Sequence, residues 1–156
     1  MLRSTRRGFF RHSYEISEDG RPAAVLAGAR REGATFSVEG GEYRVVRNGY
    51  KAFTLTGPDG EVAKAERVGG RTWTISSLYV PLELVRTSIW KETYEVTRFG
   101  ETVGTLRQDG TFKNTSSADL PDDLPLPLRL FVVYLVETLW ERSRQTASAG
   151  GVSAVG

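Results

Sequence analysis

Four arginines close to the start of the chain are the residues whose side chains are best suited to bind a ligand. No acidic residue lies among the first eleven positions, so their guanidinium groups form a locally basic segment. Guanidinium groups stay charged and bind phosphates and carboxylates in a planar, bidentate geometry. The segment predicts contact with an anionic membrane lipid or an acidic protein, and the alternative is a solvated tail. The predicted contact residues are Arg3, Arg6, Arg7 and Arg11, joined by Arg44 and Arg47 if their strands lie nearby.

Catalytic and metal-binding residue sets are scarce. The chain has no cysteine and one histidine, His12, which leaves no basis for a thiolate site, a multi-histidine metal site or a Ser-His-Asp arrangement. Glu15 and Glu95 recur at equivalent places in two repeats, and outward strand positions explain them. The acidic stretch 118–125 is too sparse and too interrupted by proline for a calcium loop. We expect a protein that is not an enzyme and uses no metal and no cofactor.

Aromatic and basic residues alternate between residues 43 and 51, as they do on β surfaces that stack nucleic-acid bases. The formal net charge of the chain is +2, so the residues other than the four N-terminal arginines sum to −2. A nucleic-acid module usually carries a strongly basic face. We therefore expect Tyr43 and Tyr50 to pack in the wall of the fold, and we expect no nucleic-acid partner.

Short alternating strands account for the chain from about residue 8 to residue 117. Apolar and polar residues alternate there, and glycine-containing turns separate the runs. Three stretches of three strands each begin at Tyr14, Phe53 and Tyr94, at spacings of thirty-nine and forty-one residues. Three units are too few to close a propeller. Together with segments 42–49 and 77–84 they predict about ten to twelve strands, and a sheet of that length must curl or close.

The segment 125–144 is the longest apolar run and the strongest helix signal. Asp122 or Asp123 can cap this helix, and apolar residues lie on all of its sides, so it must be buried all round. A membrane span needs about 20 predominantly apolar residues, whereas this run is shorter and contains Arg129 and Glu137. A barrel of about eleven strands can hold a central helix. The predicted fold is mainly β: a closed antiparallel β-barrel of about 10–12 strands that encloses one hydrophobic C-terminal helix.

These patterns also predict the domain organisation. We expect a basic N-terminal arm at 1–7, a single barrel domain at 8–145 with its central helix at about 126–144, and a disordered tail at 146–156. The basic start lacks the apolar region and the cleavage site of a secretory signal. We therefore expect a monomeric, cytoplasmic protein, peripheral at the membrane surface where lipid binding holds it there, with no transmembrane segment.

The hairpins YEISEDGRPAAVL and YEVTRFGETVGTL, followed by LPLRLFVVYLVETLWERS, carry a family resemblance. The layout resembles the tubby C-terminal-like superfamily, in particular its small LURP-one-related and phospholipid-scramblase-like members, over residues 8 to 145. The resemblance implies a closed barrel of about a dozen strands threaded by its C-terminal helix. It also implies a non-enzymatic module that binds phosphoinositide headgroups through basic residues. No stretch of this chain matches the tubby lysine and arginine motif, so no binding residue is carried over by position.

The alternative function is that of a small-ligand-binding β-barrel of lipocalin type. In such a barrel the C-terminal helix packs outside with a polar outer face, and the lumen stays free for a ligand. The helix predicted here lacks a polar outer face over residues 128–136. The leading hypothesis is therefore a tubby-like binding module that contacts a lipid headgroup or a protein partner.

Overall fold

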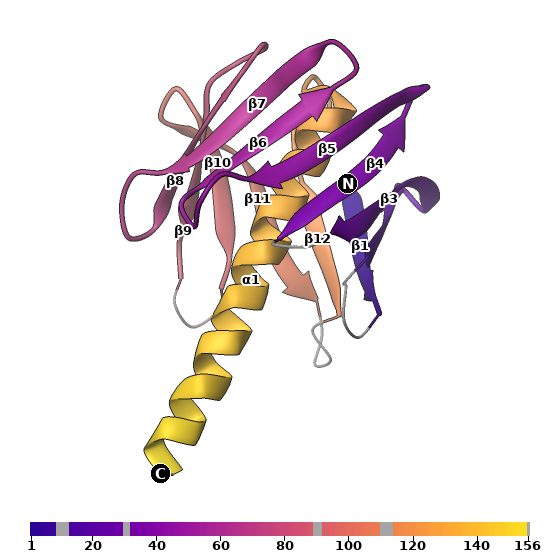
Figure 1. The fold of residues 1–156 in the computed structure, drawn as a ribbon. Coiled ribbons are helices and arrows are strands. Elements are labelled where there is room, and N and C mark those ends of the chain that lie inside the picture. The colour runs from indigo at the N-terminus through magenta and orange to yellow at the C-terminus, as the bar shows by residue number, and fades with distance from the viewer. Residues whose placement is uncertain (9–12, 30–31, 89–91, 110–113, 156) are drawn as a thin grey trace.

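Twelve antiparallel strands form a closed barrel, and one helix follows them (Figure 1). The computed structural model describes residues 1–8, 13–29, 32–88, 92–109 and 114–155. Each strand pairs with its neighbours in sequence, and β1 closes the ring by pairing with β12, which confirms the predicted fold class. The strands are β1 (Leu2–Arg7), β2 (Ser13–Glu18), β3 (Arg21–Ala29), β4 (Gly33–Val38), β5 (Gly41–Arg47), β6 (Ala52–Gly57), β7 (Gly60–Arg67), β8 (Thr72–Ser77), β9 (Leu82–Arg86), β10 (Tyr94–Arg98), β11 (Glu101–Asp109) and β12 (Thr115–Asp119).

The sequence repeat reappears as a repeat of hairpin geometry. The hairpins β2–β3, β6–β7 and β10–β11 have the same register and a β-bulge at the same place, because one extra residue in the second strand shifts the pairing. The equivalent pairs are Tyr14 with Leu26, Phe53 with Ala65 and Tyr94 with Leu106, and the bulged residues are Ala23, Val62 and Val103. A unit contains four strands rather than the expected three, since segments 42–49 and 77–84 continue the same meander.

The two ends of the barrel differ in their connections. At one end, here called the turn end, three two-residue turns join neighbouring strands, and both residues of each turn have positive φ. Such type I′ turns match the twist of the paired strands. Met1 and the start of the helix lie at this end, and the helix leaves the barrel at the other, the exit end (Figure 1). The turns are Asp19-Gly20, Glu39-Gly40 and Phe99-Gly100.

The first residues are part of the barrel, and the prediction of a separate arm at 1–7 is wrong. β1 pairs with β2 on one side and with β12 on the other, so it is the strand that closes the ring. Leu2 and Ser4 face inward and are buried, whereas Arg3 is exposed. This inside–outside alternation has the period of a half-buried strand. Arginines at the outward positions gave the segment the composition of a polar tail.

The helix α1 (Leu126–Val155) begins on a proline rather than on an aspartate cap. The carbonyl of Pro125 accepts the first helical hydrogen bond, from the backbone N–H of Arg129 at 3.1 Å. Pro127 lies in the first turn, where a missing N–H leaves no helical bond unmade. Asp123 instead accepts a hydrogen bond from Arg98 Nη1 at 2.8 Å. The expected cap by Asp122 or Asp123 is therefore wrong, because the proline geometry already starts the helix.

The helix fills the lumen of the barrel. Every residue from 127 to 138 is buried, so all sides of more than three turns are covered. Tyr134 packs edge-on against Tyr14 of β2, and Trp140 packs in the same way against Tyr94 of β10, with 6.1 Å between ring centroids in both pairs. The Tyr134 hydroxyl donates to the Gly33 carbonyl on β4 at 2.7 Å. The predicted enclosure is confirmed, and the external helix of the lipocalin alternative is not observed.

The helix continues beyond the barrel to Val155 (Figure 1), where the sequence predicted an end near residue 144 and a disordered tail from 146. The residues from 145 to 147 are exposed, so this part of the helix has left the lumen. Alanine, which recurs in this segment, has the highest helix propensity, and extending an existing helix needs no new nucleation. These two factors outweigh the glycines on which the prediction of disorder relied.

One carboxyl group lies inside the lumen. Glu137 is buried beside the seam where β1 meets β12, and Ser116 Oγ of β12 donates to its Oε1 at 2.5 Å. Burial raises the pKa of Glu137 above its usual range, although the Ser116 hydrogen bond and the charges of Arg144 and Arg6 act in the opposite direction. The protonated form of this carboxyl is therefore favoured by the fold.

Val133→Asp should prevent folding. Val133 is buried on the lumen helix, so the change places an unpaired carboxylate where no water can solvate it. The expected cost is several kcal/mol, which is of the order of the whole stability of a domain. Val68→Asp, at a position that is 60% exposed, is the control and should fold normally. A dispersed amide NMR spectrum for Val133→Asp would contradict the enclosed helix.

Glu137→Gln should change how stability depends on pH. In the wild type the folded state holds its proton more tightly than the unfolded state, so the free energy of unfolding falls as pH rises from the ordinary carboxyl pKa through the raised pKa of Glu137. Glutamine cannot ionise, so the variant should lack this fall. Urea unfolding of both proteins across that pH range measures the difference. A stability difference that is the same at every pH would argue against a protonated Glu137.

Candidate functional site

The structure separates the arginines that the sequence grouped near the N-terminus. Arg3 and Arg7 are exposed on β1, where Arg7 Nε lies 3.6 Å from Glu15 of the neighbouring strand. Arg6 points to the helix, and its Nη1 donates to Glu141 Oε2 at 3.1 Å. Arg11 lies outside the described residues. The described N-terminal arginines therefore divide between the outer surface and the contact with the helix.

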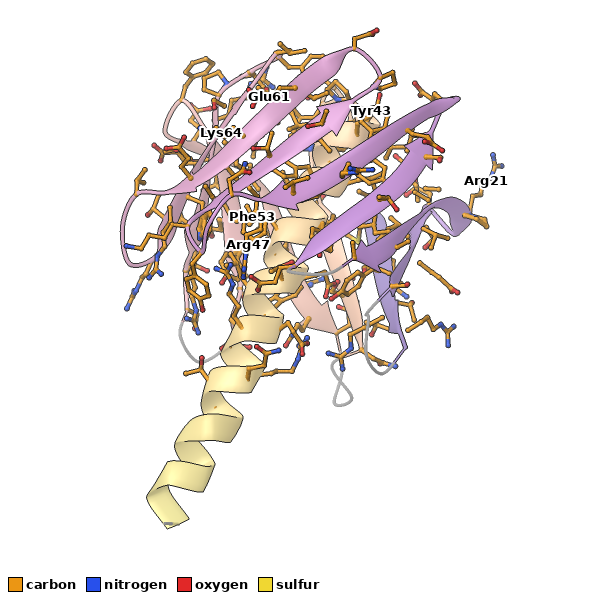
Figure 2. All side chains as sticks on the ribbon, in the orientation of Figure 1. Arg21, Tyr43, Arg47, Phe53, Glu61 and Lys64 are labelled. Carbon is orange, nitrogen blue, oxygen red and sulfur yellow. The ribbon has the colours of Figure 1, made fainter. Side chains whose placement is uncertain are left out.

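The two arginines of β5 are also divided. Arg44 is exposed on the outer face, whereas Arg47 Nη1 donates to Glu32 Oε1 at 2.9 Å near the helix. Figure 2 shows Arg47 and Phe53 beside the helix, toward the exit end. Three strands stand between β1 and β5 in the ring, so the predicted residues do not form one cluster. Arg6 and Arg47 are committed to ion pairs that hold the helix.

Four other arginines share a pocket at the exit end. The pocket has a volume of about 420 Å³ and lies between the emerging helix and the wall strands β7, β8 and β9. Tyr50, Trp73 and Tyr94 line it together with the arginines, and no acidic residue is among the described residues that line it. We call it the arginine pocket after Arg67, Arg71, Arg86 and Arg142.

Arg142 is the structural floor of the arginine pocket. Its Nε and Nη2 donate to the two oxygens of Glu32 at 2.8 Å each, and its Nη1 donates to the Tyr50 carbonyl at 2.9 Å. The guanidinium carbon lies 3.8 Å from the centroid of the Tyr50 ring, which is cation–π geometry. This arginine is 8% exposed and fixes the helix to β4, β5 and the 48–51 loop.

Glu32 receives two arginines and stays ionised. Burial alone acts to raise its pKa, but hydrogen bonds from Arg142 and Arg47 and the charges of both groups outweigh burial and hold the pKa below its usual range. One carboxylate between two guanidinium groups leaves one positive charge uncompensated. That charge remains at the floor of the arginine pocket and favours an anion there.

Three consecutive helix residues clamp the helix at the exit end. Successive side chains on a helix project about 100° apart, so residues 141–143 reach different walls. Glu141 accepts hydrogen bonds from Arg6 of β1 and from Arg144, Arg142 binds Glu32, and the Ser143 hydroxyl donates to Glu92. The position and the rotation of the helix are therefore fixed where the arginine pocket forms.

Arg86 lies in the wall of the arginine pocket with part of its hydrogen-bonding capacity unused. Its Nη2 lies 3.5 Å from Glu92 Oε1, and that carboxylate also binds Ser143. The Arg86 Nε is buried, and it has no hydrogen-bond partner among the described residues. A buried donor without a partner is costly, and such groups are uncommon in proteins.

Arg67, the last residue of β7, and Arg71, on the loop that joins β7 to β8, stand at the rim. Arg67 donates to the carbonyls of Gly69 and Gly70 in its own loop, at 3.0 and 3.3 Å. Within the part of the chain that the structure describes, no carboxylate lies within ion-pair distance of Arg67 or Arg71. Both side chains are exposed, so they are the guanidinium groups most available to a ligand.

The four arginines of this site lie in separate segments of the sequence, so no single stretch predicts the site. The glycines of the stretch ERVGGR are typical of a hairpin turn, and residues 68–71 join β7 to β8, but nothing in the stretch alone assigns a role to its two arginines. Arg86 ends β9 and Arg142 lies in the helix, so the four arginines come from three distant segments. Only closure of the barrel around the helix brings them together. In the sequence alone, the four arginines clustered near the N-terminus form a clearer pattern than the four dispersed arginines of the pocket.

No helix in the described parts of the chain is long and apolar enough to cross a bilayer. The described residues also contain no group of three or more histidine, aspartate or glutamate side chains arranged to hold a metal ion. Comparisons of the chain with protein-family models, with curated proteins and with solved structures found no match. The site is therefore interpreted from its own geometry.

Glu32→Gln should destabilise the protein, by about 1–2 kcal/mol, because it weakens three charge-assisted hydrogen bonds at a partly buried position. The depressed pKa of Glu32 means that its contribution is present above the ordinary carboxyl pKa and is lost as pH falls through the folded-state pKa. Urea unfolding at neutral and at acidic pH should show a difference from wild type that shrinks at the acidic end. An unchanged difference would contradict the ionised Glu32.

Proposed function

We propose that this protein is a non-enzymatic binding module that contacts phosphorylated lipid headgroups through the arginine pocket. The observation that carries the proposal is the pair Arg67 and Arg71, which are exposed and have no described carboxylate partner at the rim of a pocket lined by arginines and by no described acidic residue. An exposed arginine usually interacts with nearby acidic residues or with water. Arg142 and Arg86 are paired with Glu32 and Glu92, whereas the charges of Arg67 and Arg71 have no such partner among the described residues, so an anion between them would lower their repulsion.

The dimensions and chemistry of the arginine pocket suit a phosphate monoester on a small ring. A volume of about 420 Å³ is at the lower end of the usual range for small-molecule sites. Guanidinium groups bind phosphate oxygens in pairs, which gives direction as well as charge. The aromatic walls formed by Tyr50 and Trp73 offer flat surfaces on which a ring can rest.

A membrane surface is compatible with the side chains around the arginine pocket. Val68, in the loop between Arg67 and Arg71, is 60% exposed, and Tyr50 is 55% exposed. Val68 on the β7–β8 loop and Tyr50 on the 48–51 loop can enter the headgroup region while the arginines bind phosphates. Each basic residue close to an anionic membrane contributes about 1 kcal/mol, so the association is weak and reversible.

The tubby-like resemblance supports the same proposal from a different direction. A twelve-stranded closed barrel around a C-terminal helix is the layout that this resemblance implies. Members of that superfamily bind phosphoinositides through basic residues. We therefore propose that the chain is a small tubby-like module that is peripheral at a cytoplasmic membrane surface, with its own arrangement of arginines in place of the missing tubby motif.

The double variant Arg67→Ala/Arg71→Ala should weaken vesicle binding by about 30-fold, the equivalent of two headgroup contacts of about 1 kcal/mol each. Sedimentation with vesicles that contain a phosphoinositide measures the affinity at low and at physiological salt. Arg3→Ala/Arg44→Ala is the matched control, since it removes the same charge from exposed positions on the outer wall. The control should bind like wild type.

Two further arms separate headgroup recognition from simple charge attraction. Vesicles with phosphatidylserine at equal surface charge should bind less tightly than phosphoinositide vesicles, and a soluble inositol phosphate should compete for the arginine pocket. Equal loss of binding in both double variants would show a diffuse electrostatic contact. No binding by wild type at low salt would remove the lipid proposal and leave a protein-binding module as the better interpretation.

A further inference from the structure

The turn between β10 and β11 differs from the other two type I′ turns in its first residue. Phe99 stands there with a φ of 52°, where the other turns place Asp19 and Glu39. Glycine, asparagine and aspartate suit this left-handed conformation, whereas a bulky side chain is strained in it. Phe99 is 81% exposed, so contacts with the core do not offset the strain. Neither the turn nor the packing of the barrel explains a phenylalanine at this position, and such strain persists mostly at functional positions.

A second exposed apolar segment lies one strand away from Phe99. The connection between β8 and β9, residues 78–81, carries Leu78 at 73% and Tyr79 at 54% exposure. β9 pairs with both β8 and β10, so this connection and the turn at Phe99 lie on either side of the same strand end (Figure 1). We call the surface that carries Leu78, Tyr79, Pro81 and Phe99 the turn-end patch.

Hydrogen bonds fix the backbone of the β8–β9 connection. The Ser77 hydroxyl donates to the Val80 carbonyl at 3.1 Å and accepts from the backbone N–H groups of Tyr79 and Val80 at 3.1 and 3.2 Å. The Leu78 N–H donates to the Val62 carbonyl at 3.1 Å, and the Val80 side chain is buried. The two exposed side chains are therefore presented on an ordered backbone, which lowers the entropy lost when a partner binds.

A hollow of about 260 Å³ adjoins Phe99 and Pro81 on the outer wall of the barrel. Outward-facing polar side chains, among them Thr74 of β8 and Thr97 of β10, also line it. The volume is below the usual range for small-molecule sites, so the hollow suits a single side chain of a larger partner. An apolar side chain there would contact the phenylalanine ring and the proline.

The charges around the hollow are negative. Glu83 lines it, and Glu101 follows the turn at Phe99 directly. Both carboxylates are exposed, and neither lies within ion-pair distance of a basic group in the described part of the chain. Lys64 of β7 and Arg98 of β10 are already paired with other carboxylates. The turn-end patch therefore combines apolar surface with negative charge that no described cation offsets.

We propose that the turn-end patch docks a short segment of a partner protein in which an apolar side chain is flanked by arginine or lysine. The apolar side chain enters the hollow beside Phe99, and the basic neighbours approach Glu83 and Glu101. An apolar anchor in a small pocket with a charged rim is a common arrangement at protein interfaces, and complementary charge adds specificity. The same charge disfavours an anionic membrane surface, which would repel these carboxylates.

The turn-end patch is separate from the arginine pocket. β8 connects the two sites, since the β7–β8 loop at its start borders the pocket and the connection 78–81 follows its end. Its six residues span about 20 Å. A partner protein at one end and an anion at the other can therefore be bound together, and the docking proposal does not depend on the lipid proposal.

Phe99→Asn separates the stability of the turn from binding. Asparagine is favoured at positive φ, so the variant should raise the midpoint of thermal unfolding by about 2–4 °C. The binding probe is a displayed library of random dodecapeptides selected on the full-length protein, and the best synthetic binder should lose at least tenfold in affinity for this variant. Val68→Asn, at another exposed apolar position, is the control and should bind like wild type. A less stable Phe99→Asn protein, or unchanged peptide affinity, would overturn the proposal.

Charge variants test the chemistry of the bound segment. Selected peptides should share an apolar residue next to arginine or lysine, and Glu83→Gln/Glu101→Gln should weaken the best binder at least fivefold at low salt, with a smaller difference at high salt. Glu15→Gln/Glu42→Gln removes the same charge from exposed positions elsewhere on the wall and should leave the affinity unchanged. An equal loss in both double variants would indicate diffuse attraction and overturn the proposal.

Two further measurements locate the contact. The best peptide should shift the amide NMR signals of β9 and of the β10–β11 turn, and Phe99→Asn should sediment with phosphoinositide vesicles as wild type does. Peptides that leave those amides unshifted would place binding elsewhere and overturn the proposal. Weaker vesicle binding by Phe99→Asn would assign the turn-end patch to the membrane and would also overturn it.

Discussion

A helix that is apolar on every side, enclosed by twelve strands, is the constraint on which the rest of this structure depends. The helix cannot be exposed because it has no polar face along its buried turns, and the barrel cannot stand empty because twelve strands enclose more space than their own side chains fill. The barrel wall therefore shields the helix from water, and the helix fills the space that water would occupy inside the barrel. The polar groups that the enclosure traps, such as Glu137 and the Tyr134 hydroxyl, are hydrogen-bonded to the wall.

Ion pairs at the exit end convert this nonspecific burial into one defined position. Apolar contacts alone depend weakly on the exact position of the helix. Breaking a buried ion pair between an arginine and a carboxylate, in contrast, lowers the stability of the folded state by several kcal/mol. Arg142 with Glu32, and Glu141 with Arg6, fix the helix to two separate parts of the ring, the segment before β4 and the strand β1. The arginines therefore have two roles. Some hold the helix, and those at the β7–β8 hairpin are available to a ligand.

The arginine pocket lies where the wall departs from the regular meander. The β7–β8 loop there carries Arg71 and two glycines beyond the ends of the paired strands. Three units with the same register and the same bulge provide a rigid frame, and such local departures from consistency are expected at functional positions.

The sequence by itself determined the strand pattern, the three-unit repeat, closure of the sheet and burial of the helix, because alternation, turn glycines and an all-round apolar helix are local properties of the chain. Tertiary structure alone decided that Leu2–Arg7 closes the ring and that Arg6 and Arg47 support the helix. It also brought Arg67, Arg71, Arg86 and Arg142 into one pocket. A pattern of residue types shows which side of a strand or helix is buried. It does not show which distant charges meet, since that depends on the register and order of all twelve strands around the helix.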